Sequence, residues 1–325
     1  MDVEVRTEQW ELKQPFRITG HEWHHSECIV VELGSDGARG RGEAQGVSYL
    51  GENAASMRAQ IESIMASLRR GVSRQELAAL LPAGGARNAV DCALWDLEAK
   101  AGGQSIWQLT GIEPGPVTTV FTIGLEATPQ AMADKARAAA AYPVLKIKLS
   151  DDRPLERLSA IRDARPDARL VVDANQGWDF PLLQRILPAC ADLRLDMIEQ
   201  PLPRGADAEL EGFRPAVTLA ADESCQDSSE LDVAARRYEM INIKLDKTGG
   251  LTEALALARK ARDKGCKLMV GNMLGTSLGM APSFVVAQLC DFVDIDGPLL
   301  LRADREHGMR YSGPEVGVFD RRLWG

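Results

Sequence analysis

From about residue 117, short apolar runs alternate with longer segments rich in Ala, Leu and Arg. The longer segments, such as TEALALARKARDKG at residues 252–265, repeat their apolar residues at helical spacing. The runs have the length of strands and read VTTVFTIG, VLKIKLS, RLVVDANQ, LDMIEQPL, VTLAADES, MINIKLDK, KLMVGNM and FVDIDGP. Eight strands with seven intervening helices predict a parallel β/α barrel. An open doubly wound sheet is the alternative, but no G-x-G-x-x-G motif follows the first strand, and eight strands in series favour closure.

The first 115 residues have mixed patterning. SECIVVELGSDGARGRGEA predicts two strands joined by a turn at Ser35–Gly37. RNAVDCALWDLEAKAGG then predicts a helix, because its apolar residues recur at helical spacing until Gly102 and Gly103 stop it. Strands followed by helices indicate a small α+β unit.

Composition excludes several classes of partner. The 325 residues carry a net charge of −9 without a basic run, which argues against a nucleic-acid or anionic-membrane surface. MDVEVRTEQW has no apolar core and is therefore no signal peptide, and no apolar run is long enough to cross a bilayer. Six scattered cysteines without a C-x-x-C predict reduced thiols in a cytoplasmic protein. The sequence leaves the oligomeric state open, a homo-oligomer included.

Nearly every barrel run begins apolar and ends polar. The carboxyl ends of barrel strands meet at one mouth, where active sites are built. A single Asp or Asn after a strand is usually a turn residue, but turn chemistry does not explain acids on three successive strands with lysines on both sides. The polar residues in question are Lys146, Lys148, Asp173, Asn175, Glu199, Asp222, Glu223, Lys244, Asp246, Asp294 and Asp296.

Three carboxylates that converge on one point repel each other, and a divalent cation relieves the repulsion. Oxygen ligands from Asp173, Glu199 and Asp222 suit Mg²⁺ or Mn²⁺, one ion per subunit. No zinc cluster is available, because the four histidines lie outside the barrel runs and no cysteine cluster exists. The sequence therefore predicts a magnesium-type site at the barrel mouth.

Lys148 and Lys244 would face each other across this cation, from the second and sixth strands. A nearby cation favours the neutral form of a lysine, so Lys146 and the metal would favour a neutral amine at Lys148. A neutral lysine can take a proton from carbon, and the metal and Lys146 can stabilise the resulting enediolate. The second lysine can return a proton to the other face. This is 1,1-proton transfer, the chemistry of racemisation or epimerisation next to a carboxylate.

The lysine pair of the second strand, followed by VVDAN, MIEQPL, AADES and NIKLDKTGG, resembles the enolase superfamily and within it the muconate-lactonising subgroup. The likeness covers essentially the whole chain. It implies a (β/α)7β modified TIM barrel, the catalytic domain, over residues 116–301. It also implies an α+β capping domain over residues 1–115, completed by residues of about 302–325. ARNAVDCALWDLEAK, YEMINIKLDKTGGLTEALALA and DIDGP are similar to dipeptide epimerases of the L-Ala-D/L-Glu type, which implies an isomerase with a dipeptide as its small-molecule substrate.

The resemblance also implies roles for single residues. Asp173, Glu199 and Asp222 match the metal ligands, and Lys148 and Lys244 match the acid/base pair. Lys247 matches neither lysine.

The substrate-binding positions implied in the same way lie on other strands. Asp294 and Asp296 match an Asp-x-Asp that holds the ammonium group of the dipeptide, and Met273 matches a position that lines the pocket. Lys146 is expected to bind the anionic end of the substrate.

One covering loop departs from the resemblance. In the Ala-Glu enzymes a loop of the capping domain offers a cationic residue to the acidic side chain, whereas here the loop reads ITGHEWHHSE and has no Lys or Arg between Arg17 and Arg39. Trp23 stands near the position of the family's arginine. It predicts either a pocket shaped for an apolar or aromatic side chain or an aromatic ring packed on the barrel rim. A histidine of this loop could still pair with an acid, which leaves Glu open.

Three other functions compete with dipeptide epimerisation. A racemase of N-acylamino acids would need the same metal and lysines but no ammonium clamp, so Asp294 and Asp296 argue against it. A muconate cycloisomerase or o-succinylbenzoate synthase-like lyase would need only one essential lysine. A binding module without catalysis predicts decay of the site, yet all five metal and lysine positions are present.

Overall fold

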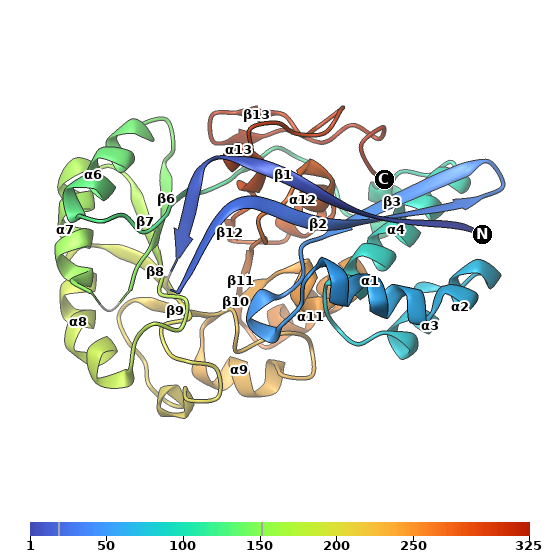
Figure 1. The fold of residues 1–325 in the computed structure, drawn as a ribbon. Coiled ribbons are helices and arrows are strands. Elements are labelled where there is room, and N and C mark those ends of the chain that lie inside the picture. Colours follow the sequence, from blue (N-terminus) through green and yellow to red (C-terminus); the bar gives the residue numbers. More distant parts are fainter. Residues whose placement is uncertain (19, 151) are drawn as a thin grey trace.

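The computed structural model describes residues 1–18, 20–150 and 152–325, and its largest element is a parallel sheet of eight strands (Figure 1). The strands are ordered in space as along the chain. The sheet closes where the amide of Val120 donates to the carbonyl of Val293, which confirms the predicted barrel. Its strands are β5 (Phe121–Ile123), β6 (Val144–Lys148), β7 (Arg169–Asp173), β8 (Leu195–Glu199), β9 (Thr218–Ala221), β10 (Met240–Ile243), β11 (Lys267–Val270) and β12 (Phe292–Val293).

Helices cover the outside of this sheet, and six of its seven connections contain the predicted α-helix. They are α6 (Pro129–Ala138), α7 (Pro154–Ala164), α8 (Phe180–Asp192), α9 (Leu231–Arg237), α10 (Leu245–Thr248) with α11 (Leu251–Asp263), and α12 (Ser277–Ala287). The prediction of a seventh was wrong, because between β8 and β9 the described residues form only the 3-10 turn η2 (Ala208–Leu210). Three prolines and two glycines between residues 201 and 215 account for the missing helix.

The first predicted strand, VTTVFTIG, is divided between two sheets. Its first part, β4 (Val117–Thr118), pairs with β14 (Glu315–Val316), which pairs in turn with β13 (Tyr311–Ser312). Only its second part, β5, belongs to the barrel. The short helix α13 (Gly297–Leu300) links the end of the barrel to this C-terminal segment.

The N-terminal part is an antiparallel sheet covered by helices. The predicted turn joins its second and third strands, with φ of 50° at Asp36 and 82° at Gly37. The elements are β1 (Asp2–Ile18), β2 (His21–Ser35), β3 (Ala38–Ala44), η1 (Ser48–Leu50), α1 (Ala54–Ser63), α2 (Met65–Arg70), α3 (Arg74–Leu80), α4 (Gly85–Ala101) and α5 (Ile106–Thr110). Trp324 donates from Nε1 to the carbonyl of Cys92 in α4, so the C-terminal end packs on this unit, but the domain boundary near residue 115 stays a prediction.

The segment predicted as a covering loop is the end of a long hairpin. Strands β1 and β2 pair from Asp2↔Gly34 to Ile18↔His21, and the irregularity in their register lies between Glu11 and Phe16. Thr19, which is part of the quoted segment, lies outside the described residues. Figure 1 shows the hairpin crossing in front of the barrel, with the helices α1 to α3 beside it.

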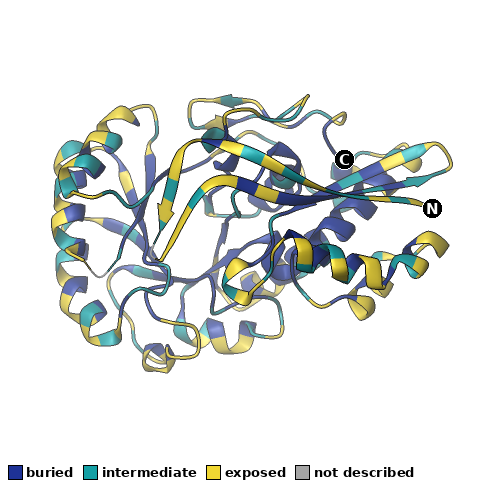
Figure 2. Cartoon of the chain, in the orientation of Figure 1, coloured by how far each residue is buried: buried dark blue, intermediate teal, exposed yellow. Residues whose placement is uncertain are grey.

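Both faces of the barrel strands are buried, and they pack into different clusters. The strands are buried along nearly their whole length, while the helices around them expose their outer sides (Figure 2). Outward-facing residues such as Leu145 and Ile147 pack against the helices in the largest core cluster. Inward-facing apolar residues form a separate cluster inside the barrel, which consists of Val120, Val144, Val171, Met197, Ala220, Met240 and Met269.

All six cysteines are free thiols in the described residues, as predicted, and five of them are buried. None of the helices described has both the length and the hydropathy needed to cross a membrane.

A carboxylate of the N-terminal unit caps a barrel helix. Asp91 in α4 accepts hydrogen bonds from the backbone amide and the hydroxyl of Thr252, in the first turn of α11. A negative charge is favourable at a helix N-terminus, but burial outweighs these bonds and raises the pKa of Asp91 to about 6. The hydrogen bonds between the N-terminal unit and the barrel at this point therefore depend on a carboxyl group, Asp91, that titrates near pH 6.

This raised pKa predicts a pH-dependent stability. The folded chain binds the proton of Asp91 more tightly than the unfolded chain, where the pKa of Asp is about 3.9. Its contribution is complete below about pH 4 and is lost as the pH rises through about 6. We expect the stability of the native sequence relative to Asp91→Asn to fall by roughly 2 kcal/mol between pH 4 and pH 7 in urea denaturation. A difference that stays constant with pH would contradict the prediction.

Candidate active site

A polar layer lies directly above the apolar layer inside the barrel. Because side chains alternate along a strand, the residue two positions after each inward apolar residue also points inward. Those positions hold Thr122, Lys146, Asp173, Glu199, Asp222, Asn242, Gly271 and Asp294. The side chains of Asp173, Glu199 and Asp222 are almost completely buried. The structure thus brings the predicted acids of the third, fourth and fifth strands together inside the barrel mouth.

Lys146 is the buried cation at the centre of this network of charges. Its Nζ lies 3.2 Å from Asp173 Oδ2, 2.7 Å from Glu199 Oε2 and 2.8 Å from Asp294 Oδ2. Burial alone would lower the pKa of Lys146, but the three carboxylates outweigh it and hold the pKa well above its ordinary value. Lys146 is therefore a permanent positive charge in this arrangement, suited to holding an anion and unsuited to accepting a proton.

Lys148 and Lys244 reach one cavity from opposite sides of the barrel. Lys148 Nζ donates to Asp173 Oδ2 and Lys244 Nζ to Asp222 Oδ2, both at 2.6 Å. Their strands, β6 and the end of β10, are four places apart in the closed order of eight and so lie diametrically opposite. Gly271 makes room for the second lysine, because a Cβ there would lie 2.9 Å from Lys244 Cε.

The charge state of Lys244 depends on the carboxylates around it. Burial lowers its pKa, but Asp222 and Glu199 outweigh burial and hold the pKa above its ordinary value. Proton abstraction by Lys244 therefore requires that another positive charge compensate these carboxylates.

The predicted ammonium clamp lies just beyond the eighth strand. We expected Asp294 and Asp296 on the strand itself, but β12 ends at Val293 and Asp296 immediately precedes α13. Asp296 Oδ2 accepts a hydrogen bond of 2.7 Å from the backbone amide of Thr122. Burial raises the pKa of Asp296, and the neighbouring Asp294 carboxylate raises it further.

The cavity above the polar layer has a volume of about 420 Å³. Lys148, Asp222 and Lys244 line it, and so do Met273 and Trp23. Other lining residues come from the hairpin and from the segment at residues 46–53, GVSYLGEN, among them Phe16, Ile18, His21, Tyr49 and Glu52. Asp294 and Asp296 are not among the lining residues.

Trp23 belongs to an aromatic group on the hairpin. Its ring lies 5.4 Å from that of His21 and 6.2 Å from that of Phe16, measured between centroids. Among the described residues that line the cavity, the cations apart from histidine are Lys148 and Lys244. The hairpin therefore lines the cavity with Phe16, Ile18 and Trp23, and also with polar side chains such as His21 and Glu27.

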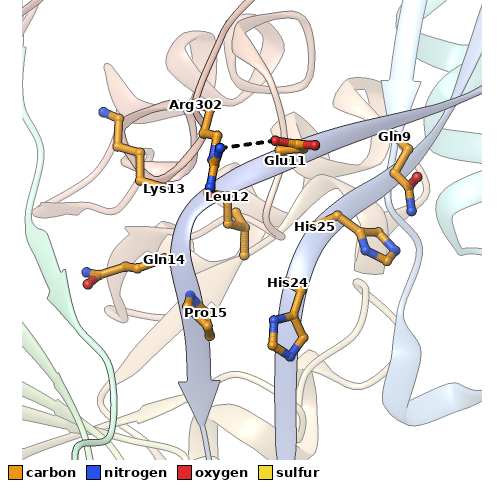
Figure 3. A pocket seen from close by; sticks show the side chains of 9 residues that line it. All are labelled: Gln9, Glu11, Leu12, Lys13, Gln14, Pro15, His24, His25 and Arg302. Atoms are coloured by element: carbon orange, nitrogen blue, oxygen red, sulfur yellow. Dashed lines mark hydrogen bonds and ion pairs between the residues drawn. The ribbon is translucent and has the colours of Figure 1, made fainter.

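A second cavity, of about 490 Å³, lies along the other side of the hairpin (Figure 3). His24 and His25 reach it from β2, and Glu11 and Gln14 reach it from β1. Glu11 is paired there with Arg302 at 3.4 Å. Neither Lys148 nor Lys244 lines this cavity, although His25 lines both this cavity and the candidate active site.

The described residues contain no group of three His, Cys, Asp or Glu side chains arranged to hold a metal ion. The lysines explain this, because they pair with each of the three predicted ligands. Glu199 Oε2 and Asp222 Oδ1 are nevertheless buried without a directed hydrogen bond, at ion-pair distances of 2.7 and 2.8 Å from lysine Nζ atoms. The candidate metal ligands are therefore three carboxylates, and two of their oxygens could still coordinate a cation.

Three polar residues that support the site had no role in the sequence analysis. Asn242 donates to Glu199 Oε1 at 2.7 Å, and buried Lys247 donates to the carbonyl of Asp222. Gln200 Oε1 accepts from the backbone amide of Asp222 at 3.0 Å. Alternation with Lys244 could have revealed Asn242. Gln200 has a left-handed backbone with φ of 36°, which no sequence signal announces.

Comparison with known proteins identifies the family. Residues 130–308 match the family described as enolase C-terminal domain-like, and residues 1–111 match the mandelate racemase / muconate lactonizing enzyme N-terminal domain. The chain belongs to the enolase superfamily. Its barrel mouth is the place where a β/α barrel carries its active site.

Two curated relatives of this chain are named for different reactions. The L-Ala-D/L-Glu epimerase of Escherichia coli is 44% identical over 97% of this chain and 98% of its own length. The N-acetyl-D-glutamate racemase of a Pseudoalteromonas species is 38% identical over 91% of this chain and 95% of its own length.

Two solved structures of superfamily members are similar over nearly the whole chain. An enolase family member from Agrobacterium tumefaciens, with homology to dipeptide epimerases and bound sodium and L-Ala-L-Glu, has a TM-score of 0.96 and 42% identity and covers 99% of both chains. The dipeptide epimerase of Enterococcus faecalis, complexed with Mg and L-Leu-L-Tyr, has a TM-score of 0.91 and 27% identity, and covers 97% of this chain and 96% of its own.

Proposed function

We propose that this enzyme epimerises a dipeptide at the α-carbon of its C-terminal residue by proton transfer between two lysines. The observation that carries the proposal is the placement of Lys148 and Lys244, which reach one cavity from diametrically opposite strands. One lysine removes the α-proton from one face, and the other delivers a proton to the opposite face. Neither a one-lysine lyase nor a binding module needs this arrangement.

The proposed metal ligands are Asp173, Glu199 and Asp222. Their chemistry fits a hard divalent cation such as Mg²⁺ or Mn²⁺, and Asp173 and Asp222 each raise the pKa of Glu199, as acids that share a site do. When bound, the cation would neutralise these carboxylates and stabilise negative charge on the substrate. Each carboxylate would exchange a lysine contact for the cation. The magnesium in the Enterococcus faecalis structure supports the proposal.

The lysines have separate tasks in this proposal. Lys146 keeps its charge, holds the carboxylate end of the substrate and stabilises the enediolate that forms when the α-proton leaves. Lys148 and Lys244 accept and return the proton. Once a cation compensates Asp222 and Glu199, the burial of Lys244 acts in the other direction and favours its neutral form.

Asp294 and Asp296 are the proposed site of the substrate's ammonium group. A buried pair of carboxylates is costly unless it meets positive charge, and Lys146, the cation paired with Asp294, is shared with two other acids. A free N-terminal ammonium supplies the missing charge. The racemase of N-acylamino acids remains the alternative, which the Pseudoalteromonas relative supports, but its substrates carry no such group.

Asp296→Asn tests the clamp. We expect the loss of one buried charge to weaken kcat/KM for a free dipeptide by ~2–3 kcal/mol. Turnover of N-acetyl-glutamate should respond much less, because this substrate offers no ammonium. Steady-state kinetics with both substrates measure the two effects. Equal losses for both would argue against an ammonium site at Asp296.

The outer cavity predicts which side chains are accepted. Trp23, Phe16 and Ile18 line it without a lysine or arginine, so apolar or aromatic residues should be accepted at the epimerised position at least as well as Glu. Comparing kcat/KM for L-Ala-L-Phe and L-Ala-L-Glu measures this preference. A strong preference for the acidic dipeptide would show that a histidine of the hairpin replaces the missing arginine.

The free state of the six cysteines supports the proposed cytoplasmic location.

A further inference from the structure

Asn272 connects the substrate cavity to the proposed ammonium clamp. It follows β11, it is half-buried, and it lines the cavity together with Lys148 and Lys244. Its Nδ2 donates to the backbone carbonyl of Asp294 at 2.7 Å and approaches the carboxylate oxygen Oδ1 of Asp294 at 3.2 Å. Asp294 itself does not line the cavity, so Asn272 stands at the boundary between the two.

The two oxygens of Asp294 are held by different partners. Lys146 Nζ donates to Oδ2 of Asp294. Asn272 Nδ2 donates to Oδ1 and to the backbone carbonyl of Asp294. The Lys146 ammonium does not belong to Asp294 alone, because it also serves Asp173 and Glu199. The second contact fixes the plane of the carboxylate beside Asp296.

The packing around Asn272 keeps its amide in place. A Cβ at Gly297 would lie 2.9 Å from Asn272 Oδ1 and 3.1 Å from the carbonyl oxygen of Gly275. Gly297 directly follows Asp296, so the absence of a side chain there lets the seventh and eighth strand ends approach closely. The close packing at Gly297 therefore holds Asp296 and Asn272 near each other.

We propose that Asn272 is a positioning residue that orients Asp294 and thereby sets the preference of the enzyme for substrates with a free N-terminal ammonium group. The inference rests on the proposed function. Asn272 acts through Asp294, by donating one hydrogen bond to its charged carboxylate and one to its backbone carbonyl. A hydrogen bond to a charged group is stronger than one between neutral groups.

Asn272→Leu tests this role because leucine keeps the branched shape of the side chain and removes its hydrogen-bond donors. The probes are L-Ala-L-Phe and N-acetyl-L-Ala-L-Phe, which differ only in the amino group. We expect KM for the free dipeptide to rise about tenfold, with kcat within about twofold, as for loss of a hydrogen bond to a charged group. The ratio of kcat/KM for free over acetylated dipeptide should then fall about tenfold. α-Hydrogen exchange in D₂O supplies the rate for the slower substrate.

Gln176→Leu is the matched control. Gln176 lines the same cavity, but its side chain accepts a hydrogen bond from the backbone amide of Arg204. This variant should keep the native ratio of free to acetylated dipeptide. Thermal melting of both variants checks that each is folded.

The outcomes separate the inference from the proposed function. Equal losses for the free and acetylated probes in Asn272→Leu would show a merely structural residue and overturn the inference. A fall of the ratio in Gln176→Leu as large as in Asn272→Leu would overturn it as well. If the native enzyme exchanges the α-hydrogen of no free dipeptide, the proposed function itself fails.

Discussion

Lys148→Ala and Lys244→Ala should each abolish epimerisation, with losses of about 10²–10⁴-fold in kcat, the range for removal of a general acid or base. Either lysine alone serves one face of the α-carbon. Each variant should therefore still exchange the α-hydrogen of one epimer with deuterium, and the two variants should differ in which epimer they label. Chiral chromatography follows epimerisation, and mass spectrometry follows deuterium uptake.

Lys267→Ala is the control for this pair. Lys267 begins β11, it is exposed, and it lies at the opposite end of the barrel from the polar layer. Its removal should leave both epimerisation and exchange at the native level. If Lys244→Ala epimerises at the native rate, the two-base mechanism is wrong and a one-lysine lyase becomes the better interpretation.

Removal of the cation should be almost as damaging as removal of a lysine. Excess EDTA should stop turnover, and added Mg²⁺ should restore it, because the acids around Lys244 hold its pKa high in the absence of a compensating charge. Asp222→Asn removes one proposed ligand charge and should lower activity by about 10²-fold or more, since even residues that only orient metal ligands cost 10–100-fold.

Asp196→Asn provides the comparison for Asp222→Asn. Asp196 lies on the neighbouring strand β8, but it pairs on the outside with Arg169 at 2.8 Å. The Asp196→Asn variant should bind the cation and turn over substrate like the native enzyme. Full turnover in excess EDTA would defeat the metal assignment whatever the two variants do.

Strand periodicity explains why so much of the site could be predicted from the sequence. Barrel strands bring their carboxyl ends to one mouth, and every second residue points inward. These two rules predict that Lys146, Asp173 and Glu199 lie close together at the barrel mouth. The barrel itself followed from the alternation of strand-length runs and helical segments.

Other features depend on contacts between distant segments and leave little trace in the local pattern. The β8–β9 connection was predicted as a helix, although its prolines and glycines permit only a 3-10 turn. The eighth strand ends before Asp294, because the chain turns there toward α13. The pairing of Lys146 with three carboxylates depends on charges from three strands and from the segment after the eighth strand, which residue spacing alone does not resolve.

The substrate preference is similarly nonlocal. The absence of a cation between Arg17 and Arg39 was visible in the sequence, but the position of Trp23 in the cavity wall depends on the hairpin crossing the barrel mouth. Asn272 had no signal of its own, because its role depends on the close approach of two strand ends at Gly297.

Deuterium uptake from D₂O into a library of free dipeptides, with N-acetyl-glutamate in parallel, tests the central claim most directly. With Mg²⁺ present, the account predicts uptake at the α-carbon of the C-terminal residue, appearance of both epimers, and faster turnover of at least one free dipeptide than of N-acetyl-glutamate. Faster turnover of N-acetyl-glutamate than of every dipeptide would contradict the account and identify an N-acylamino acid racemase.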